Sequence, residues 1–346
     1  MHNLLKYVIR VNASIKDALV ALNCLSDNTL TLFVLDAQDK MVGTLTDGDV
    51  RRALIEGYDL SMSIDKAMNP NFHYIRINDL SVERVRTLRE KGITLLPVLT
   101  DEKKIQTVYN LKEKKSILPV DAVLMAGGKG ERLRPLTEKT PKPLLKVGDK
   151  CIIDYNVDRL IEYGVENINV TVNYLGEQIE KHFENERHHV QVHCVREPQY
   201  LGTLGSVKFI DKFYNDTVLV MNSDLFTNIN FEDFFLHFKK NDADMSVAAI
   251  PYSVSVPYGI FDLKDRVIKG VKEKPTYNYY ANSGIYLIKK KLLDLIPDGL
   301  FYNATDLIER LIEEKYNVIR FPLMGYWIDI GKHEDYKKAQ DFVKHL

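Results

Sequence analysis

From residue 121 onward, short apolar runs alternate with stretches whose apolar residues recur at helical spacing. The apolar runs predict strands, and the amphipathic stretches between them predict helices. Strand and helix alternation of this kind favours right-handed βαβ crossovers and a mainly parallel sheet with helices on both faces. The predicted strands are 121–127, 167–173, 189–195, 217–224 and 244–250, and the predicted helices are 151–164, 175–185 and 231–241.

The first part of the chain has a different pattern, which is a weak internal repeat. Residues 11–23 match residues 77–90 as a short strand, a polar cap and a helix, and residues 32–46 match 95–109 as strand, turn and strand. Each half is too small to bury both faces of its sheet, so the halves should pack as one module. We expect two domains, 1–117 (repeats of about 1–60 and 61–117) and 118–346.

Composition limits what the two domains can do. The chain has 346 residues, of which 45% are hydrophobic and 27% charged, with a net charge of −1. These values are those of a globular protein without long-range attraction for nucleic acid or an anionic membrane, so any anion site must be local. The three cysteines lack metal-ligand spacing, and neither a signal peptide nor an apolar run of about 18 residues is found. We expect a cytoplasmic protein.

One loop concentrates positive charge directly after the first strand of the second domain. It reads LMAGGKGERLRPLTEKTPKPLL, residues 124–145. Its glycines allow backbone N–H groups to approach an anion, but a Walker A loop and a Rossmann fingerprint are excluded by the residues that follow them. The prolines should keep the loop extended, and its cations fit a polyphosphate better than a packed core. The loop also lies at the carboxyl end of a strand, where such sheets bind ligands.

This loop resembles the signature of sugar-1-phosphate nucleotidyltransferases, and further motifs follow in that family's order. They are NSD at 222–224, EKP at 273–275, NSGIY at 282–286 and WIDIG at 327–331. The resemblance implies a Rossmann-like, glycosyltransferase-A-like α/β fold with a mixed, mostly parallel sheet. It also implies Mg²⁺ held by Asp224 and Asp329, catalytic Arg132 and Lys142, and a sugar phosphate held by Lys274. The alternative is a purely structural role, in which each aspartate only caps a loop or a helix.

The resemblance also assigns residues to the nucleotide and to the sugar. Nucleotide contacts would come from Ala126, Gly127, Gly128, Gly130, Glu197, Gly202 and Thr203. Sugar-phosphate contacts would come from Tyr258, Gly259, Glu273, Lys274 and Asn282. An ionised Glu197 only accepts hydrogen bonds, which suits the N1–H and N2–H₂ donors of guanine, whereas glutamine would suit thymine or uracil. We therefore expect GTP, unless Glu197 faces solvent or pairs with Arg196.

The N-terminal module resembles a pair of CBS motifs, in which Thr46 and Asp49 would hold an adenine nucleotide. The equivalent positions of the second repeat, Tyr109 and Lys112, depart from that pattern. An equally weighted alternative is that Thr46 and Asp49 only cap a helix. Such a module can also serve as a dimerisation surface, and we expect a homo-oligomer.

A CBS pair ahead of a guanylyl-type domain resembles the glucosamine-1-phosphate guanylyltransferases of bacterial legionaminic acid synthesis, which supply a GDP-sugar for cell-surface polysaccharide. Mannose or heptose 1-phosphate as acceptor, and thymidylyl or uridylyl transfer to glucose 1-phosphate, stay open. A different class, a nucleotide-sensing regulatory protein without turnover, is the alternative to an enzyme.

Overall fold

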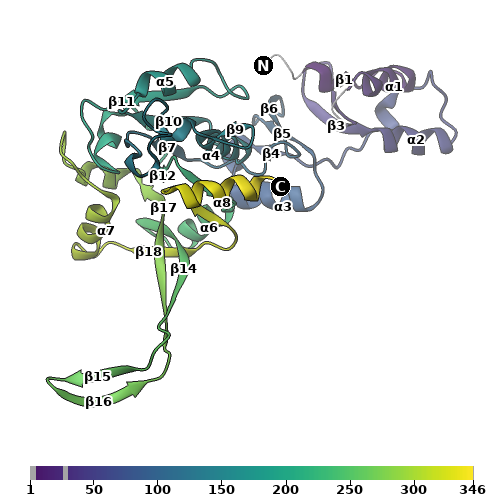
Figure 1. Cartoon of the computed structure of the whole chain (residues 1–346). Helices are drawn as coiled ribbons and strands as arrows, with labels where there is room; N and C mark the ends of the chain where they lie inside the picture. The colour runs from purple at the N-terminus through teal and green to yellow at the C-terminus, as the bar shows by residue number, and fades with distance from the viewer. Residues whose placement is uncertain (1–4, 26–29, 346) are drawn as a thin grey trace. The chain divides into compact units, whose positions relative to one another are not determined.

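The computed structural model describes residues 5–25 and 30–345. The chain divides into two compact units, residues 1–117 and 118–346, coloured from purple to blue and from teal to yellow in Figure 1. Each unit is described by itself below. Among the described residues, none of the helices combines the length and apolar character needed to cross a bilayer.

The first unit contains two small sheets of the same design. Both sheets have three strands, in the orders β1-β2-β3 and β4-β5-β6, and in both the first pair is parallel and the second antiparallel. The elements are β1 (Val8–Arg10), α1 (Ile15–Asn23), β2 (Thr31–Leu35), β3 (Met41–Thr46), α2 (Asp47–Ile55), β4 (Ile75–Arg76), α3 (Val82–Glu90), β5 (Leu95–Leu99) and β6 (Ile105–Asn110).

The two halves of this unit share a core. Leu95 and Leu99 of β5 pack in the same buried cluster as Ile15, Leu32 and Phe33 of the first half. The backbone N–H of Met41 also donates to the carbonyl of Lys103 at 2.9 Å. Each half therefore buries a face of its sheet against the other, as expected for repeats too small to fold alone.

The second unit is built on a seven-stranded sheet of order β11-β10-β7-β12-β17-β14-β18. Four of its six strand pairings are parallel, so the expected mixed, mostly parallel sheet is confirmed. The sheet strands are β7 (Asp121–Met125), β10 (Asn167–Val172), β11 (Val192–Arg196), β12 (Thr217–Asn222), β14 (Met245–Ser255), β17 (Thr276–Lys289) and β18 (Val318–Pro322).

Helices cover this sheet with their apolar sides. In α7 the side chains of Leu307 and Leu311 are buried against Val218 and Val220 of β12. The helices are α4 (Ile152–Glu162), α5 (Gly176–His182), α6 (Phe231–Lys240), α7 (Ala304–Glu313) and α8 (His333–Val343).

Short strands outside the main sheet bring distant segments together. They are β8 (Lys146–Val147), β9 (Lys150–Cys151), β13 (Leu225–Thr227), β15 (Ile260–Lys264), β16 (Val267–Lys272) and β19 (Trp327–Asp329). Strand β13 pairs antiparallel with β19, so that Leu225 lies opposite Asp329. The backbone N–H of Ile330 donates to the carbonyl of Asp224 at 3.2 Å. This pairing places the two aspartates of the NSD and WIDIG motifs side by side.

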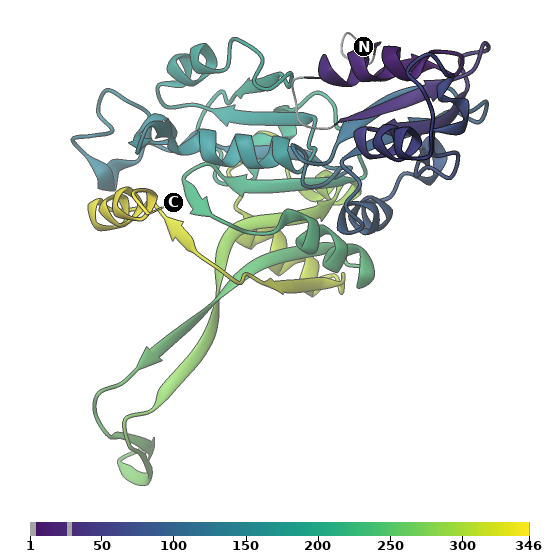
Figure 2. The ribbon, with the colours of Figure 1, turned by 90° about the vertical axis from the view of Figure 1, so that its right-hand side faces the viewer.

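Strands β14 and β17 continue well beyond the sheet as a two-stranded ribbon that carries the β15–β16 hairpin at its tip. We call residues 250–281 the arm. Figures 1 and 2 show the arm, in green, projecting from the rest of the unit in both views. The sequence pattern predicted a strand ending at residue 250, whereas β14 reaches Ser255.

Candidate active site

A cavity of about 650 Å³ opens at the carboxyl ends of β7 and β12. Met125, Ala126 and Gly127 of the glycine-rich loop line one part of it, and Asn222, Ser223 and Asp224 line another. Its remaining lining residues are Gly128, Lys129, Gly130, Glu131, Arg132, Lys142, Pro143, Glu197, Tyr200, Gly202, Thr203, Asp329 and Gly331. The cavity therefore occupies the position at which a mostly parallel sheet binds ligands.

The glycine-rich loop follows a tight path that two of its glycines make possible. A Cβ at Gly127 would clash with Oε1 of Glu197. Gly130 has a φ of +61°, and a Cβ there would lie 3.1 Å from the Cβ of Lys142. Both positions exclude larger residues for geometric reasons, because the loop folds back on the side chains that line the cavity.

The expectation that the whole loop is extended was wrong. Single 3₁₀ turns span Glu131–Leu133 and Lys142–Leu144. The second turn accommodates Pro143 because its bonds run from Leu144 to Pro141 and from Leu145 to Lys142, so the N–H that proline lacks is not required. The turn directs Lys142 into the cavity.

Lys142 lies between the two aspartates that the sequence predicted as metal ligands. Its ammonium pairs with Asp224 Oδ2 and lies 3.9 Å from Asp329 Oδ1. Only 12% of its side chain is exposed, so this charge is far more confined than an ordinary surface lysine. The pKa of Asp329 lies above its ordinary value, mainly because the carboxyl group is buried and also because the Asp224 carboxylate is close. Lys142 and Arg132 offset only part of this rise.

Arg132 lies beside the same cluster. The Cβ position of Gly331 lies 3.6 Å from Arg132 Nη2 and 3.7 Å from Asp329 Oδ2, so Gly331 leaves room for both groups. The alternative that Asp329 caps the last helix is not observed, since α8 begins after Lys332. Two cations and two carboxylates thus meet at one edge of the cavity.

The two aspartates fit a divalent cation. Asp224 Oδ1 is buried and has no hydrogen-bond partner among the residues that the structure describes. Carboxylate oxygens are the ligands that Mg²⁺ prefers, and an unpartnered buried oxygen beside a second carboxylate is a site that a cation would stabilise. The donor set is therefore compatible with Mg²⁺ held by Asp224 and Asp329.

A second group of potential metal ligands does not fit a metal as well. Cys151, Asp154 and His182 have ligand atoms within 4.8 Å of one another. However, Arg187 donates to Asp154 Oδ1 at 2.9 Å, and His182 Nε2 lies 2.7 Å from the same oxygen. A guanidinium already supplies the positive charge there, so this group is a hydrogen-bonded anchor between α4 and the α5 region.

Glu197 is buried in the cavity wall, with 4% of its surface exposed. Its Oε2 accepts from the backbone N–H of Leu201 at 3.0 Å, and burial raises its pKa. Arg196 instead pairs with Glu177 and Glu180, each at 2.7 Å. The two alternatives for Glu197, exposure to solvent and pairing with Arg196, are therefore both wrong.

The segment that follows Glu197 is fixed to the start of α7. The Thr203 hydroxyl accepts from the N–H of Ala304 at 2.8 Å, and the Thr203 N–H donates to Asn303 Oδ1 at 3.3 Å. Gly202 has a φ of +80°, and a Cβ there would lie 2.7 Å from the carbonyl oxygen of Tyr302. Both residues line the cavity. The Thr203 hydroxyl already accepts a hydrogen bond from Ala304, so in this structure it connects the cavity wall to the start of α7.

The residues expected to bind the sugar phosphate are not brought to this cavity. Tyr258, Gly259, Glu273 and Lys274 lie on the arm, where Tyr258 is 74% exposed. Asn282 lies at the base of the arm, and its amide donates to Tyr286 Oη and accepts from the N–H of Gly284, each at 2.9 Å. The nucleotide half and the sugar half of the predicted site are therefore apart in this chain.

Some lining residues were missed by the sequence analysis. Asn222 was predicted only as part of the NSD motif. Its side-chain amide lies against the position that a Cβ of Gly284 would take, so β12 and β17 are in close contact beside the cavity. Tyr200 and Lys129 also line the cavity. The signal that could have found them is their position inside motifs that were already noted.

In the first unit, Thr46 and Asp49 form the cap of α2. The N–H of Asp49 donates to the Thr46 hydroxyl at 3.2 Å, and Asp49 Oδ2 accepts from the Thr46 N–H at 2.8 Å and from its hydroxyl at 2.6 Å. Asp49 also pairs with Arg52. The helix-cap alternative is thus observed, and a nucleotide role for these residues stays a prediction.

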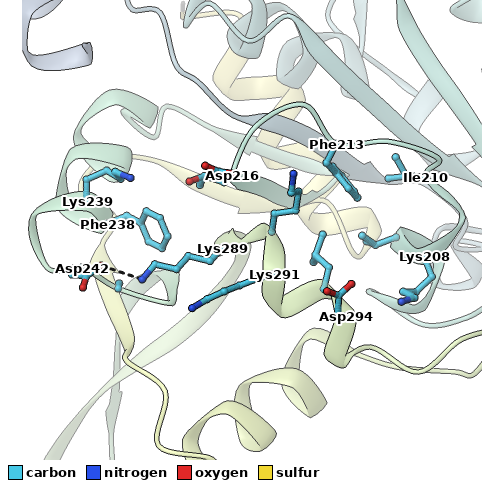
Figure 3. Close-up of a pocket in the computed structure, with 15 residues that line it drawn as sticks. Lys208, Ile210, Phe213, Asp216, Phe238, Lys239, Asp242, Lys289, Lys291 and Asp294 are labelled. Atoms are coloured by element: carbon cyan, nitrogen blue, oxygen red, sulfur yellow. Dashed lines mark hydrogen bonds and ion pairs between the residues drawn. The ribbon is translucent and has the colours of Figure 1, made fainter. Parts of the chain in front are cut away.

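A second cavity, of about 700 Å³, lies at the opposite end of the sheet, beside Thr217 at the start of β12 and Lys289 at the end of β17. Figure 3 shows that its lining mixes apolar side chains such as Phe213 and Phe238 with lysines and aspartates. Lys289 is bound to Asp242 at 3.0 Å and to Asp244 at 3.1 Å, and Lys208 to Asp298 at 3.1 Å. Lys208 and Lys289 are therefore neutralised by carboxylates of the same chain.

Together, the mostly parallel sheet, the glycine-rich loop and the cation–carboxylate cluster define an α/β protein with a polar, charged cavity at the carboxyl ends of its strands. Comparison with known proteins identifies the family. Residues 121–345 match the family model for nucleotidyl transferases. The chain therefore belongs to the nucleotidyl transferase family, and the resemblance to sugar-1-phosphate nucleotidyltransferases is confirmed at that level.

Individual relatives agree with this assignment. The bifunctional protein GlmU of Methanocaldococcus jannaschii is 31% identical over 65% of this chain and 54% of its own length. The D-glycero-alpha-D-manno-heptose 1-phosphate guanylyltransferase of Aneurinibacillus thermoaerophilus is 26% identical over 65% of this chain and 99% of its own. The crystal structure of HddC from Yersinia pseudotuberculosis superposes with a TM-score of 0.51 at 25% identity, covering 65% of this chain and 99% of that one.

These matches do not extend over the whole of every relative. The chain spans 54% of GlmU and 62% of two further curated relatives. The matched part corresponds to the second unit, which contains the cavity.

Proposed function

We propose that this protein transfers a nucleoside monophosphate from an NTP to a sugar 1-phosphate, producing an NDP-sugar and pyrophosphate. The observation that carries the proposal is the cavity in which the glycine-rich loop, Lys142, Asp224 and Asp329 meet. A phosphate oxygen of the sugar 1-phosphate would attack the α-phosphorus in line as the bond to the pyrophosphate oxygen breaks. The leaving pyrophosphate takes the electron pair, so no protein nucleophile is required.

The residues of the cavity address the main obstacle, which is the repulsion between two anionic substrates. Backbone N–H groups of the glycine-rich loop would hold the triphosphate. Arg132 and Lys142 would neutralise the charge that develops on the α-phosphate and the pyrophosphate. When bound between Asp224 and Asp329, Mg²⁺ would supply further neutralisation of the phosphate oxygens.

The position of Lys142 also affects how a cation would bind. In the structure its ammonium occupies the space between the carboxylates that would hold the cation. With a cation held by Asp224 and Asp329, the Lys142 ammonium would face the phosphates, since two like charges would otherwise compete for Asp224.

The base is proposed to be guanine. Glu197 offers a buried acceptor beside Gly127, and its Oε2 is already engaged by the Leu201 N–H. An ionised carboxylate accepts two hydrogen bonds from N1–H and N2–H₂ of guanine and has no donor for a uracil or thymine carbonyl. The guanylyltransferase named among the relatives is consistent with this choice.

The acceptor sugar is proposed to be glucosamine 1-phosphate, with mannose and heptose 1-phosphates as the alternatives. A carboxylate such as Glu273 would favour a substrate that carries an ammonium group. The resulting GDP-sugar would be a donor for cell-surface polysaccharide.

One panel assay tests the function, the base and the sugar together. The full chain is incubated with Mg²⁺, each NTP and each sugar 1-phosphate, and pyrophosphate release is measured. We expect release with GTP and glucosamine 1-phosphate. No release with any pair would refute the enzyme and favour a nucleotide-binding regulator, while a preference for UTP or dTTP would refute the role given to Glu197.

The first unit is proposed to be a CBS pair that binds an adenine nucleotide near Thr46 and Asp49. Both side chains would have to exchange part of their mutual hydrogen bonding for the ligand. Calorimetry of the full chain with AMP tests this, since the second unit is expected to select guanine. Heat that persists in the Thr46→Ala variant, or no heat at all, would argue against this site.

A further inference from the structure

The arm exposes an unusual amount of apolar surface. Ten of its large hydrophobic side chains are between 41% and 74% exposed: Tyr252, Val254, Tyr258, Phe261, Leu263, Val267, Ile268, Val271, Tyr279 and Tyr280. At roughly 100 Å² each, they amount to about 1,000 Å². This apolar surface is divided between the two faces of the ribbon, since successive residues such as Tyr279 and Tyr280 point to opposite sides, and exposed apolar surface of several hundred Å² marks a contact with another molecule.

The arm also has unpaired edges. Strand β14 pairs with β18 only from Met245 to Ala249, and β17 pairs with β12 only from Ile285 to Lys289. Beyond these points, in the part of the chain that the structure describes, the two strands pair only with each other. Because a two-stranded ribbon is marginally stable alone in water, the arm should gain its stability from a surface that covers it.

The arm carries the EKP motif too far from the cavity of its own chain for Lys274 to reach it. Gly284 contacts Asn222 in the cavity wall, but from there β17 runs outward to Thr276. Eight residues of extended strand span about 26 Å. Lys274 has no ion pair within the described residues, so nothing in its own chain uses this charge.

Folding the arm back over its own cavity would be costly. The ladder is continuous from the Ala249–Asn282 pair to the Ser255–Thr276 pair, and the irregularity of β14 lies before it, between Val247 and Ala249. Cross-strand hydrogen bonds join Ser253 to Asn278 at 2.7 Å and Ser255 to Thr276 at 3.0 Å. A return path would have to break this ribbon or bend it sharply at its base.

We propose that the arm docks on a second copy of this chain and that Lys274 of each chain completes the sugar-phosphate subsite of the other. This inference rests on the proposed function, because Lys274 is assigned to the sugar phosphate there. A two-fold axis makes the exchange reciprocal, so that each cavity gains one arm and each arm gains one cavity. The area of about 1,000 Å² per chain exceeds the roughly 800 Å² per partner of a stable interface.

The charge of the arm also favours a second copy of this chain as its partner. Residues 260–274 contain five cations, Lys264, Arg266, Lys269, Lys272 and Lys274, against three anions, Asp262, Asp265 and Glu273. The cavity is lined by three cations, Lys129, Arg132 and Lys142, and four carboxylates, Glu131, Glu197, Asp224 and Asp329, and would hold two phosphorylated substrates. The substrates give the filled cavity a clear excess of negative charge, which the positive charge on the tip complements better than a generic apolar partner would.

Complementation between two inactive variants tests the exchange. Lys142→Ala damages the cavity, and Lys274→Ala damages the arm. The two full-length chains are co-expressed with different tags, and the mixed dimer is isolated by two affinity steps. If arms are exchanged, one site of the mixed dimer combines an intact cavity with an intact arm, so we expect about half of the wild-type rate. If each arm serves its own cavity, both sites stay damaged and the rate stays at that of the parents, which overturns the proposal.

A mixed dimer of two cavity variants controls for a nonspecific recovery of activity. Arg132→Ala and Lys142→Ala both lie in the cavity, so their mixed dimer should not regain activity. Wild-type protein is assayed in parallel: turnover there without recovery in the mixed dimer refutes the exchange alone, whereas a wild type inactive with every substrate pair refutes the proposed function.

Crosslinking gives a readout that does not depend on turnover. On a Cys24→Ser background, one chain carries Lys274→Cys and a chain of different mass carries Glu131→Cys at the cavity rim. A short bismaleimide should join the two different chains. A monomeric mass in solution, or a crosslink that forms only when both substitutions are on one chain, would overturn the proposal.

Discussion

At the residue scale, the site depends on side chains that are far apart in sequence and fit one another closely. Gly127 has no room for a Cβ because Glu197 lies against it, and Lys142 lies between Asp224 and Asp329. These residues were predicted from the resemblance of their motifs to those of sugar-1-phosphate nucleotidyltransferases, and the alternation of strands and helices placed the glycine-rich loop at the end of a strand. The hydrogen bonds of Glu197 and Thr203 were not predictable, because they join segments whose approach is fixed only by the folded backbone.

Lys142 is expected to contribute mainly to the chemical step. Replacing it with alanine removes a confined charge beside the developing negative charge, and we expect kcat to fall by about 10²- to 10³-fold. Steady-state kinetics of pyrophosphate release measures this. The matched control is Lys139→Ala, an exposed lysine of the same loop, which should change kcat less than twofold.

Glu197→Gln should change base selection. The amide can donate to a uracil or thymine carbonyl, whereas the carboxylate cannot, so the ratio of kcat/KM for GTP over UTP should fall by at least tenfold. An unchanged ratio would show that Glu197 does not contact the base.

The same substitution has a pH signature in stability. Because burial raises the pKa of Glu197 in the folded state, the folded state holds its proton to higher pH than the unfolded state does. This group therefore lowers stability progressively as pH rises above its ordinary pKa. Glu197→Gln should stabilise the second unit more at pH 8 than at pH 4.5, as followed by the fluorescence of the single tryptophan, Trp327.

At the scale of elements, the parallel strands and most helices followed from periodicity, but the arm did not. Residues 251–281 alternate apolar and polar positions as any half-buried strand does. A period of two fixes which residues share a face, and does not say whether that face lies on the sheet or leaves it. Tyr258 and Lys274 were assigned to the sugar phosphate from the resemblance of their motifs, which does not say how far the arm carries them from the cavity.

The cap of α2 gives a test at this scale. Thr46→Ala removes the side-chain acceptor for the Asp49 N–H and should destabilise the helix by about 1 kcal/mol. Amide exchange over Asp47–Ile55 should then speed up about fivefold, if it proceeds through opening of this helix. Thr46→Ser keeps the hydroxyl and should leave exchange close to that of the wild type.

At the scale of the whole molecule, the chain joins a repeat module to a nucleotidyl transferase family unit whose arm projects outward. The near-zero net charge, −1, gives no long-range attraction between copies, so association would depend on the apolar arm and on local charge. The wild type is therefore expected to have twice the mass of one chain by light scattering at micromolar concentration.

Breaking the arm surface should separate the copies without unfolding either. Phe261 and Val271 are paired across the hairpin and are 58% and 59% exposed. Replacing both with glutamate should raise the dimer dissociation constant by at least 100-fold. Ile312→Glu, at an equally exposed position on α7, is the control and should leave the mass unchanged. A dimer that survives the double substitution would place the interface elsewhere.

The free edges of the arm have a consequence for handling the protein. Unpaired strand edges template further β-pairing, and the hairpin tip combines them with the exposed side chains of Phe261, Leu263 and Val271. The charged residues interspersed along the tip act as gatekeepers against such pairing. A chain diluted below the dissociation constant of the dimer would expose this ribbon to other ribbons. Above that constant the concentration of exposed ribbons grows only as the square root of the total concentration, so aggregation should rise less steeply with concentration than it would for a chain that does not pair.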